Sequence, residues 1–297
     1  MIIETRIPIK YILGIAKGDL LRIIPLSLIL TTYTEVYHFT FDIPFSIPAV
    51  LGTAISLVLS FKLSQSYDRW WEARKIWGAI VNDSRNLVVQ LKNFCSQEDH
   101  KLIALISMRQ ISWCYALEQH LRHTYNIKVL EAFLSQDDKR TVNKGKHRPL
   151  VLIDLIGKDI KSLYHKGLIN SYQQITLFNT LEKLVDSMGQ AERIKNTIFP
   201  ILYRLFLKLF IYSYIIILAI ALSELDYYYE FPLLIVLTMP FVMLEKTAFL
   251  LQDPFENRPN DTAMTTICRA IESNIKELIN EPEDQTDTAI KEDFYIL

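Results

Sequence analysis

The sequence predicts an all-α integral membrane protein with four transmembrane helices and a helical cytoplasmic domain, and three observations lead to this fold class. Half of the residues (50%) are hydrophobic, and they gather in long apolar stretches instead of spreading along the chain. These stretches form two pairs, one in the first quarter of the chain and one between residues 198 and 252. The region between the pairs is polar, with apolar residues recurring at helical spacing.

The first three apolar stretches are close to the length that a helix needs to cross a bilayer, about 20 residues, whereas the fourth is short. The predicted spans are Leu20 to Phe39, Pro44 to Phe61, Ile198 to Leu222, and a fourth that starts at Phe231. Only roughly 20 Å of helix, at about 1.5 Å per residue, precedes the charged pair Glu245 and Lys246 in the fourth span. Either this helix leaves the lipid early, or the pair faces protein or water inside an assembly.

The spans divide the chain into five segments with a predicted orientation. They are an N-terminal cytoplasmic or interfacial segment (1–19), helices one and two (20–61), a cytoplasmic helical domain (62–197), helices three and four (198–252), and a C-terminal cytoplasmic helix and tail (253–297). The two loops inside the helix pairs contain no Lys or Arg, whereas basic residues flank the opposite ends. Because basic residues stay on the cytoplasmic side, we expect a multi-pass protein of the cell membrane with both termini in the cytoplasm.

Composition excludes some other classes of protein. The formal net charge is -1 and no basic stripe is present, which argues against nucleic-acid binding. The histidines are scattered and no nucleophile or phosphate-loop motif appears, so we expect neither an enzyme nor a cofactor or metal site. The three cysteines lack the close spacing of a zinc or redox motif, which favours packed, reduced thiols over a disulfide or metal site.

The most specific motif follows the second span. It is SYDRWWEARKIWGAIVNDSRN, from Ser66 to Asn86, and it contains Arg69, Trp70 and Trp71. These three side chains are also what an interfacial anchor would use, since Trp and Arg favour the lipid–water boundary. Their position after an uncharged helix resembles the bestrophin family, whose hallmark Arg-Trp-Trp occupies the same place.

The resemblance covers most of the chain. It extends to QAERIKNTIFPILY (190–203) and to DPFENRPND, where Asp253, Pro254 and Phe255 match the family's Asn/Asp-Pro-Phe. It implies a bestrophin-like homopentamer with four membrane helices per subunit and an axial pore lined by the second helix. Eukaryotic members hold calcium in acidic residues after Pro-Phe, but Arg258 and Pro259 interrupt that run here, so we expect no calcium activation.

The resemblance also implies the positions of the constrictions. Matched by distance from Arg-Trp-Trp, the hydrophobic neck falls on Thr53, Leu57 and Phe61, which share one helix face at intervals of four. Rings of Leu and Phe gate by constricting and dewetting a pore, whereas Thr leaves its level wetter. The alternative is that this stripe packs against a neighbouring helix. A second, cytoplasmic aperture is expected at Tyr172, with Ile169 as the next match.

The predicted function is passive conduction of small monovalent ions, either an anion such as chloride or a cation such as sodium. The outer loops favour cations, because Glu35 and Asp42, together with Glu224, Asp226 and Glu230, would form acidic rings at the outer mouth. The expected partners are other copies of the chain, the lipid bilayer and the ions. The alternative is a non-conducting membrane scaffold or signalling protein, which would form monomers or dimers in detergent.

Overall fold

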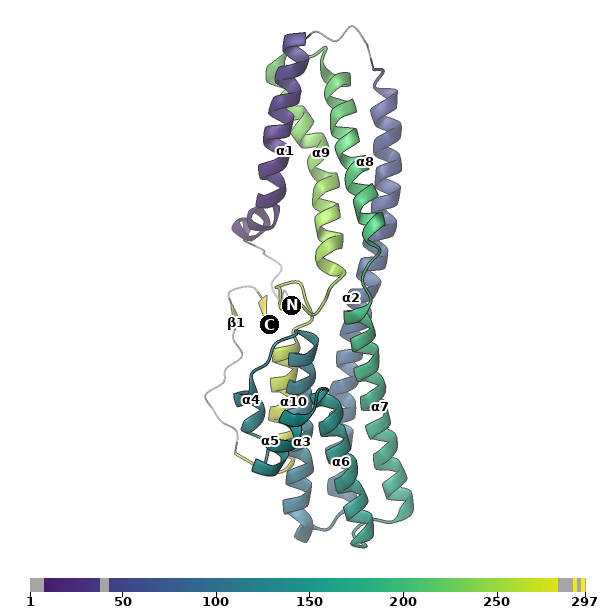
Figure 1. Cartoon of the computed structure of the whole chain (residues 1–297), viewed down its shortest axis with the longest axis vertical. Coiled ribbons are helices and arrows are strands. Elements are labelled where there is room, and N and C mark those ends of the chain that lie inside the picture. The colour runs from purple at the N-terminus through teal and green to yellow at the C-terminus, as the bar shows by residue number, and fades with distance from the viewer. Residues whose placement is uncertain (1–7, 38–42, 283–290, 293–294, 297) are drawn as a thin grey trace. The chain divides into compact units, whose positions relative to one another are not determined.

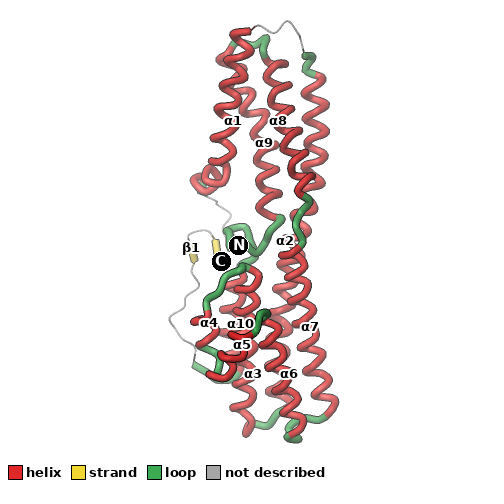
Figure 2. Tube along the Cα trace, viewed as in Figure 1, coloured by secondary structure: helices red, strands yellow, loops and turns green. Residues whose placement is uncertain are grey.

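The computed structural model describes residues 8–37, 43–282, 291–292 and 295–296, and these residues are almost entirely helical (Figures 1 and 2). The α-helices are α1 (Ile9–Tyr37), α2 (Ser46–Phe94), α3 (His100–Leu121), α4 (Ile127–Glu131), α5 (Gln136–Lys144), α6 (Arg148–His165), α7 (Ser171–Asn196), α8 (Ile201–Leu222), α9 (Tyr227–Leu251) and α10 (Met264–Leu278). A 3-10 turn covers Gln97–Asp99, and the two-residue strands β1 (Lys291–Glu292) and β2 (Tyr295–Ile296) pair antiparallel.

The chain divides into two compact units, which we name the membrane unit and the helical unit. Of the described residues, the membrane unit comprises 8–37, 43–70 and 198–252, and the helical unit comprises 71–197, 253–282, 291–292 and 295–296. Helix α2 belongs to both, because it continues without interruption through the boundary between Trp70 and Trp71. The sequence placed the corresponding boundary earlier, after Phe61.

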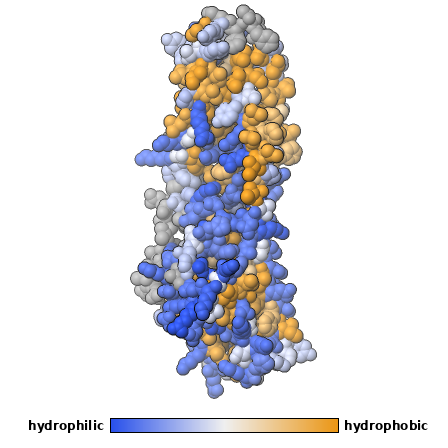
Figure 3. Space-filling view, viewed as in Figure 1, coloured by the Kyte–Doolittle hydropathy of each residue, from blue (hydrophilic) through white to orange (hydrophobic). Residues whose placement is uncertain are grey.

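The membrane unit is a bundle of α1, α8, α9 and the first part of α2, and its visible face is largely apolar (Figures 1 and 3). Its core joins Ile55 and Leu59 of α2 to Ile211 and Ile215 of α8 and Leu234 of α9. Helix α1 packs against α8 and α9. Apolar surface facing outward suits a unit that is solvated by lipid.

Three described helices are long and apolar enough to cross a membrane, namely α2, α8 and α9. The first predicted span forms a helix, α1, but it does not reach the hydropathy of the other three, because polar residues such as Arg22 and Glu35 dilute it. Its predicted end at Phe39 lies outside the described residues. Helix α9 does not stop at the charged pair, since it continues to Leu251 with Glu245 buried.

The helical unit packs α3 against α6, α7 and α10 around a core that includes Trp77 and Trp113. Helix α7 begins at a capping box, in which the Asn170 side chain accepts a hydrogen bond from the Gln173 amide and the Gln173 side chain accepts one from the Asn170 amide. Helix α5 ends at Lys144 and α6 begins at Arg148, so only the residues between them lie outside helices.

A buried ion-pair network fastens the short helix α5 to α3 and α6. Arg109 of α3 donates to both carboxylate oxygens of Asp138 in α5, at 3.1 and 2.7 Å, and it also contacts Asp159 of α6. Arg109 and Asp138 are both buried. The bidentate guanidinium therefore gives the buried Asp138 carboxylate two charge-assisted hydrogen bonds.

Removing this guanidinium should therefore destabilise the helical unit. We predict that Arg109→Leu lowers the free energy of unfolding by about 3 kcal/mol or more, because it leaves buried carboxylates without a cation. The matched control is Arg140→Leu, which breaks an exposed pair with Asp137 and should change stability by about 0.5 kcal/mol or less. Thermal unfolding in detergent measures both, and equal shifts for the two variants would refute the role of the network.

Candidate functional site

The predicted neck residues form an uncovered stripe on α2. Thr53, Leu57 and Phe61 are all exposed in the single chain, with exposed fractions of 60% for Leu57 and 61% for Phe61. The Thr53 hydroxyl donates to the Ala49 carbonyl of its own helix at 2.8 Å, so its proton is already engaged. Ser60 lies beside the stripe and is also exposed. This face therefore combines apolar rings with small hydroxyls and carries no charge.

The opposite face of α2 is buried and sets the rotation of the helix about its own axis. The Tyr203 hydroxyl of α8 donates to the Val58 carbonyl at 2.9 Å. At Gly52 a side-chain Cβ would lie only 3.3 Å from the Tyr214 ring and 3.6 Å from the Phe241 ring, so α8 and α9 approach closely where α2 has no side chain. These contacts hold α2 with the Thr53–Leu57–Phe61 stripe facing away from the bundle.

A buried ion pair joins α2 to α9 at Lys62, the residue after Phe61. The Lys62 amine donates to Glu245 of α9 at 3.0 Å, and Lys62 is 0% exposed. The Phe199 ring centroid lies 6.0 Å from the same amine. The pair explains how a carboxylate is accommodated within an apolar helix. It also turns the Lys62 charge away from the uncovered stripe.

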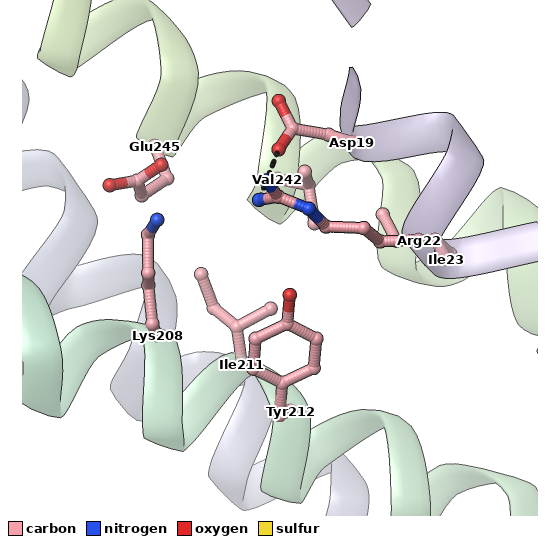
Figure 4. A pocket seen from close by; sticks show the side chains of 8 residues that line it. All are labelled: Asp19, Arg22, Ile23, Lys208, Ile211, Tyr212, Val242 and Glu245. Atoms are coloured by element: carbon pink, nitrogen blue, oxygen red, sulfur yellow. Dashed lines mark ion pairs between the residues drawn. The ribbon is translucent and has the colours of Figure 1, made fainter. Parts of the chain in front are cut away.

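Further charges from three helices surround a small pocket near this pair (Figure 4). Arg22 of α1 lies 3.9 Å from Asp19, whose other oxygen lies 3.6 Å from the Lys246 amine. In Figure 4 the Lys208 amine of α8 points toward the Glu245 carboxylate. The cavity measures about 30 Å³, which is the size of one water molecule. The cavity is therefore too small for a ligand larger than a water molecule.

The Arg-Trp-Trp motif has a structural role at the end of α9. The Arg69 Nε donates to the carbonyl of Gln252, the C-cap residue of α9, at 2.9 Å. A cation at a helix C-terminus also interacts favourably with the helix dipole. Trp70 is half-buried beside the Tyr67 ring, at 5.8 Å between centroids, whereas Trp71 is exposed. Arg69 thus provides a second contact between α2 and α9, seven residues after Lys62 in the chain.

The segment after α9, residues 253–262, is stabilised by contacts within the helical unit. Phe255 is buried in the core of the helical unit, and the Pro254 carbonyl accepts a hydrogen bond from the Thr262 amide at 3.0 Å. Glu256 accepts from the Lys195 amine at 2.6 Å, which lowers the pKa of its carboxyl group. Asp253 is half-buried at the start of this segment.

Asp261 is the most perturbed acid of this segment. Its Oδ2 accepts from the Arg258 amide at 3.0 Å, and burial raises the pKa of its carboxyl group to about 6. Because Glu256 and Asp261 already have partners within the chain, they serve the fold of the loop. The expected lack of calcium activation stays a prediction.

The remaining predicted site residues are placed as follows. Tyr172 is 83% exposed in the first turn of α7, whereas Ile169 is only 4% exposed and lies in the core of the helical unit. We therefore keep Tyr172 alone for the cytoplasmic aperture. Glu35 is exposed on α1, and Asp42 lies outside the described residues. Glu230 is buried and accepts a hydrogen bond from Thr34 at 3.0 Å, so it does not join an acidic ring.

The fold and this site define a largely helical membrane protein that has a membrane unit and a second, helical unit. The chain belongs to the bestrophin family, because the model of the bacterial/fungal bestrophin proteins matches residues 12–277. It is 28% identical over 266 residues to a voltage-dependent anion channel-forming protein of Nostoc sp., covering 86% of this chain and 85% of that protein. It is 30% identical over 241 residues to the voltage-dependent anion channel-forming protein YneE of Escherichia coli, covering 81% of this chain and 77% of that protein.

The fold also matches solved structures. A bacterial bestrophin homolog from Klebsiella pneumoniae superposes with a TM-score of 0.83, covering 89% of this chain and 100% of that chain at 24% sequence identity. A variant of that homolog gives a TM-score of 0.85. The resemblance found in the Arg69–Trp70–Trp71 and Asp253–Pro254–Phe255 motifs is therefore confirmed.

The Lys62–Glu245 pair generates a prediction about stability. Lys62→Met leaves the Glu245 carboxylate buried without its cation and should lower the free energy of unfolding by about 3 kcal/mol. The double variant Lys62→Met/Glu245→Met removes both charges and should recover much of this loss. Lys158→Met breaks an exposed pair with Asp154 and serves as the control. A double variant less stable than Lys62→Met, measured by thermal unfolding in detergent, would contradict this account.

The raised pKa of Asp261 generates a prediction about pH. Between about pH 4 and the folded-state pKa of about 6, the folded protein holds a proton at Asp261 that the unfolded chain has lost. The stability from this group is therefore complete below about pH 4 and is lost as the pH rises through about 6, with a slope of at most about 1.4 kcal/mol per pH unit. Asp261→Asn should lack this slope. Parallel stability curves for the wild type and the variant from pH 4.5 to 7.5 would show the assignment to be wrong.

Proposed function

We propose that this chain is a subunit of a homopentameric, bestrophin-like ion channel in the cell membrane, with an axial pathway lined by α2. The observation that carries the proposal is the uncovered, uncharged stripe of Thr53, Leu57 and Phe61 on a helix whose other face is fixed to α8 and α9. Family membership supports the same reading, as do the names of the curated relatives. Four membrane helices per subunit are part of the proposal, with α1 as the least apolar.

The neck would act through its lack of charge and its apolar rings. Five copies of Leu57 and Phe61 around an axis would form two apolar constrictions, and a narrow apolar segment closes to ions when water leaves it. Five copies of Thr53 would form a third level of the neck that holds more water than the Leu57 and Phe61 levels. Lys62 would not contribute a charge to this pathway, because its amine is bound to Glu245 on the opposite face. Tyr172 would line a second constriction at the start of α7.

The permeant ion is a small monovalent ion, and two observations favour different signs. The relatives are named anion channel-forming proteins, which favours chloride. The exposed carboxylate of Glu35, multiplied by five, favours cations such as sodium at the outer mouth. The reversal potential of the channel in a salt gradient distinguishes these two cases. Changing Glu35 and Asp42 to Gln and Asn should move that potential toward anions if the outer ring concentrates cations.

The alternative function is a non-conducting scaffold anchored by the same helices. In that case the stripe would pack against a helix of another protein or face lipid, and the purified chain would be a monomer or dimer. The mass of the detergent-solubilised particle separates the two functions.

The direct test measures sodium and chloride flux in liposomes. We predict that Leu57→Ala and Phe61→Ala each raise the flux at least several-fold, because a smaller side chain widens and wets the neck. Leu205→Ala and Phe206→Ala are matched controls, since these residues of α8 are exposed to a similar extent, and their flux should stay near the wild-type level. Equal effects of the two pairs, or no flux in any variant, would overturn the proposal.

A further inference from the structure

Three helices of the helical unit bring two imidazoles and one carboxylate together. His120 lies in the last turn of α3, His147 is the N-cap residue of α6, and Glu192 lies near the end of α7. The His147 Nε2 is 2.8 Å from the Glu192 Oε1, and the His120 Nε2 is 3.5 Å from the same oxygen. The two rings lie 4.6 Å apart between centroids. Within the described part of the chain, this is the only group of three or more His, Cys, Asp or Glu side chains with its ligand atoms within 4.8 Å of one another.

From this geometry we infer that His120, His147 and Glu192 form a binding site for a zinc-like divalent metal ion that joins the ends of α3, α6 and α7. Two imidazole nitrogens and a carboxylate oxygen are a donor set that zinc takes in proteins, with water in the fourth position. Donor atoms around one tetrahedral zinc ion lie roughly 3.3 Å apart, given bonds of about 2.0–2.1 Å. The separations of 2.8 and 3.5 Å lie on either side of that value, so small side-chain rotations close the site.

The ion would have a route into the site and space for its water ligand. A cavity of about 280 Å³ is lined by His120 and its neighbours, and it adjoins the cluster. All three ligands are half-buried, so solvent reaches them. The cavity is also lined by Lys146 and Arg148, whose charges oppose a cation, but the Arg148 guanidinium lies over the Tyr125 ring at 3.5 Å. The carboxylate of Glu192 supplies the negative charge that the site needs.

Metal binding would change one hydrogen bond at the start of α6. The His147 Nδ1 accepts from the Leu150 amide at 3.2 Å, so without metal the ring proton sits on Nε2 and is donated to Glu192. A metal ion at Nε2 requires the proton on Nδ1, so the proton moves from one ring nitrogen to the other and the Leu150 amide loses its acceptor. Hydrogen exchange at Leu150 should therefore become faster on binding, while the ends of α3 and α7 become more protected.

The test uses the full chain in detergent after removal of metals with a chelator. A calorimetric titration with zinc should give a stoichiometry of one ion per chain for the wild type. His147→Asn keeps an N-cap oxygen but removes the imidazole, and it should weaken binding at least 10-fold, as should His120→Gln. His165→Gln is the matched control, because His165 is exposed and lies outside the cluster. Its affinity for zinc should equal that of the wild type.

Two results would overturn the inference. One is a wild type that takes up no zinc at 100-fold molar excess, and the other is an affinity that His120→Gln and His147→Asn leave unchanged. Glu192→Gln should also weaken binding while its unfolding temperature without metal stays close to that of His165→Gln, which separates lost binding from lost folding. The inference concerns binding alone, and it stands or falls independently of whether the chain conducts ions.

Discussion

The rotational setting of α2 is the constraint on which the rest of the structure depends. This helix has an uncovered face with Thr53, Leu57 and Phe61 and a buried face fixed by the Tyr203 hydrogen bond, the Gly52 contact and the Lys62–Glu245 pair. A rotation by one residue would bring the Lys62 charge toward the uncovered face and turn a neck residue into the bundle. The buried ion pair opposes that rotation strongly, because the buried Glu245 carboxylate would then be left without its cation.

The sequence predicted features that depend on neighbours along the chain. Apolar length located α2, α8 and α9, which are long and apolar enough to cross a membrane. The Arg69–Trp70–Trp71 motif identified the family. Features that depend on distant residues were not predicted. The partner of Glu245 lies 183 positions away at Lys62, and Lys62 read only as one of several basic residues after the second span.

Burial was the other quantity that the sequence left open. Ile169 and Glu230 were predicted at an aperture and in an acidic ring, yet both are buried. Glu230 hydrogen bonds to Thr34 of a helix that is remote in sequence, which no local pattern indicates. The cluster of His120, His147 and Glu192 was missed for the same reason, since its three ligands come from three helices and have no motif spacing.

The central claim is that the Thr53–Leu57–Phe61 face of α2 meets water and not lipid. Cysteine labelling tests it most directly, because the native cysteines at 95, 114 and 268 are buried and give little background. With Leu57→Cys in liposomes, a membrane-impermeant thiol reagent should react and block the ion flux, whereas Leu205→Cys on α8 should remain unmodified. A reactive Leu205→Cys beside an unreactive Leu57→Cys would contradict the account.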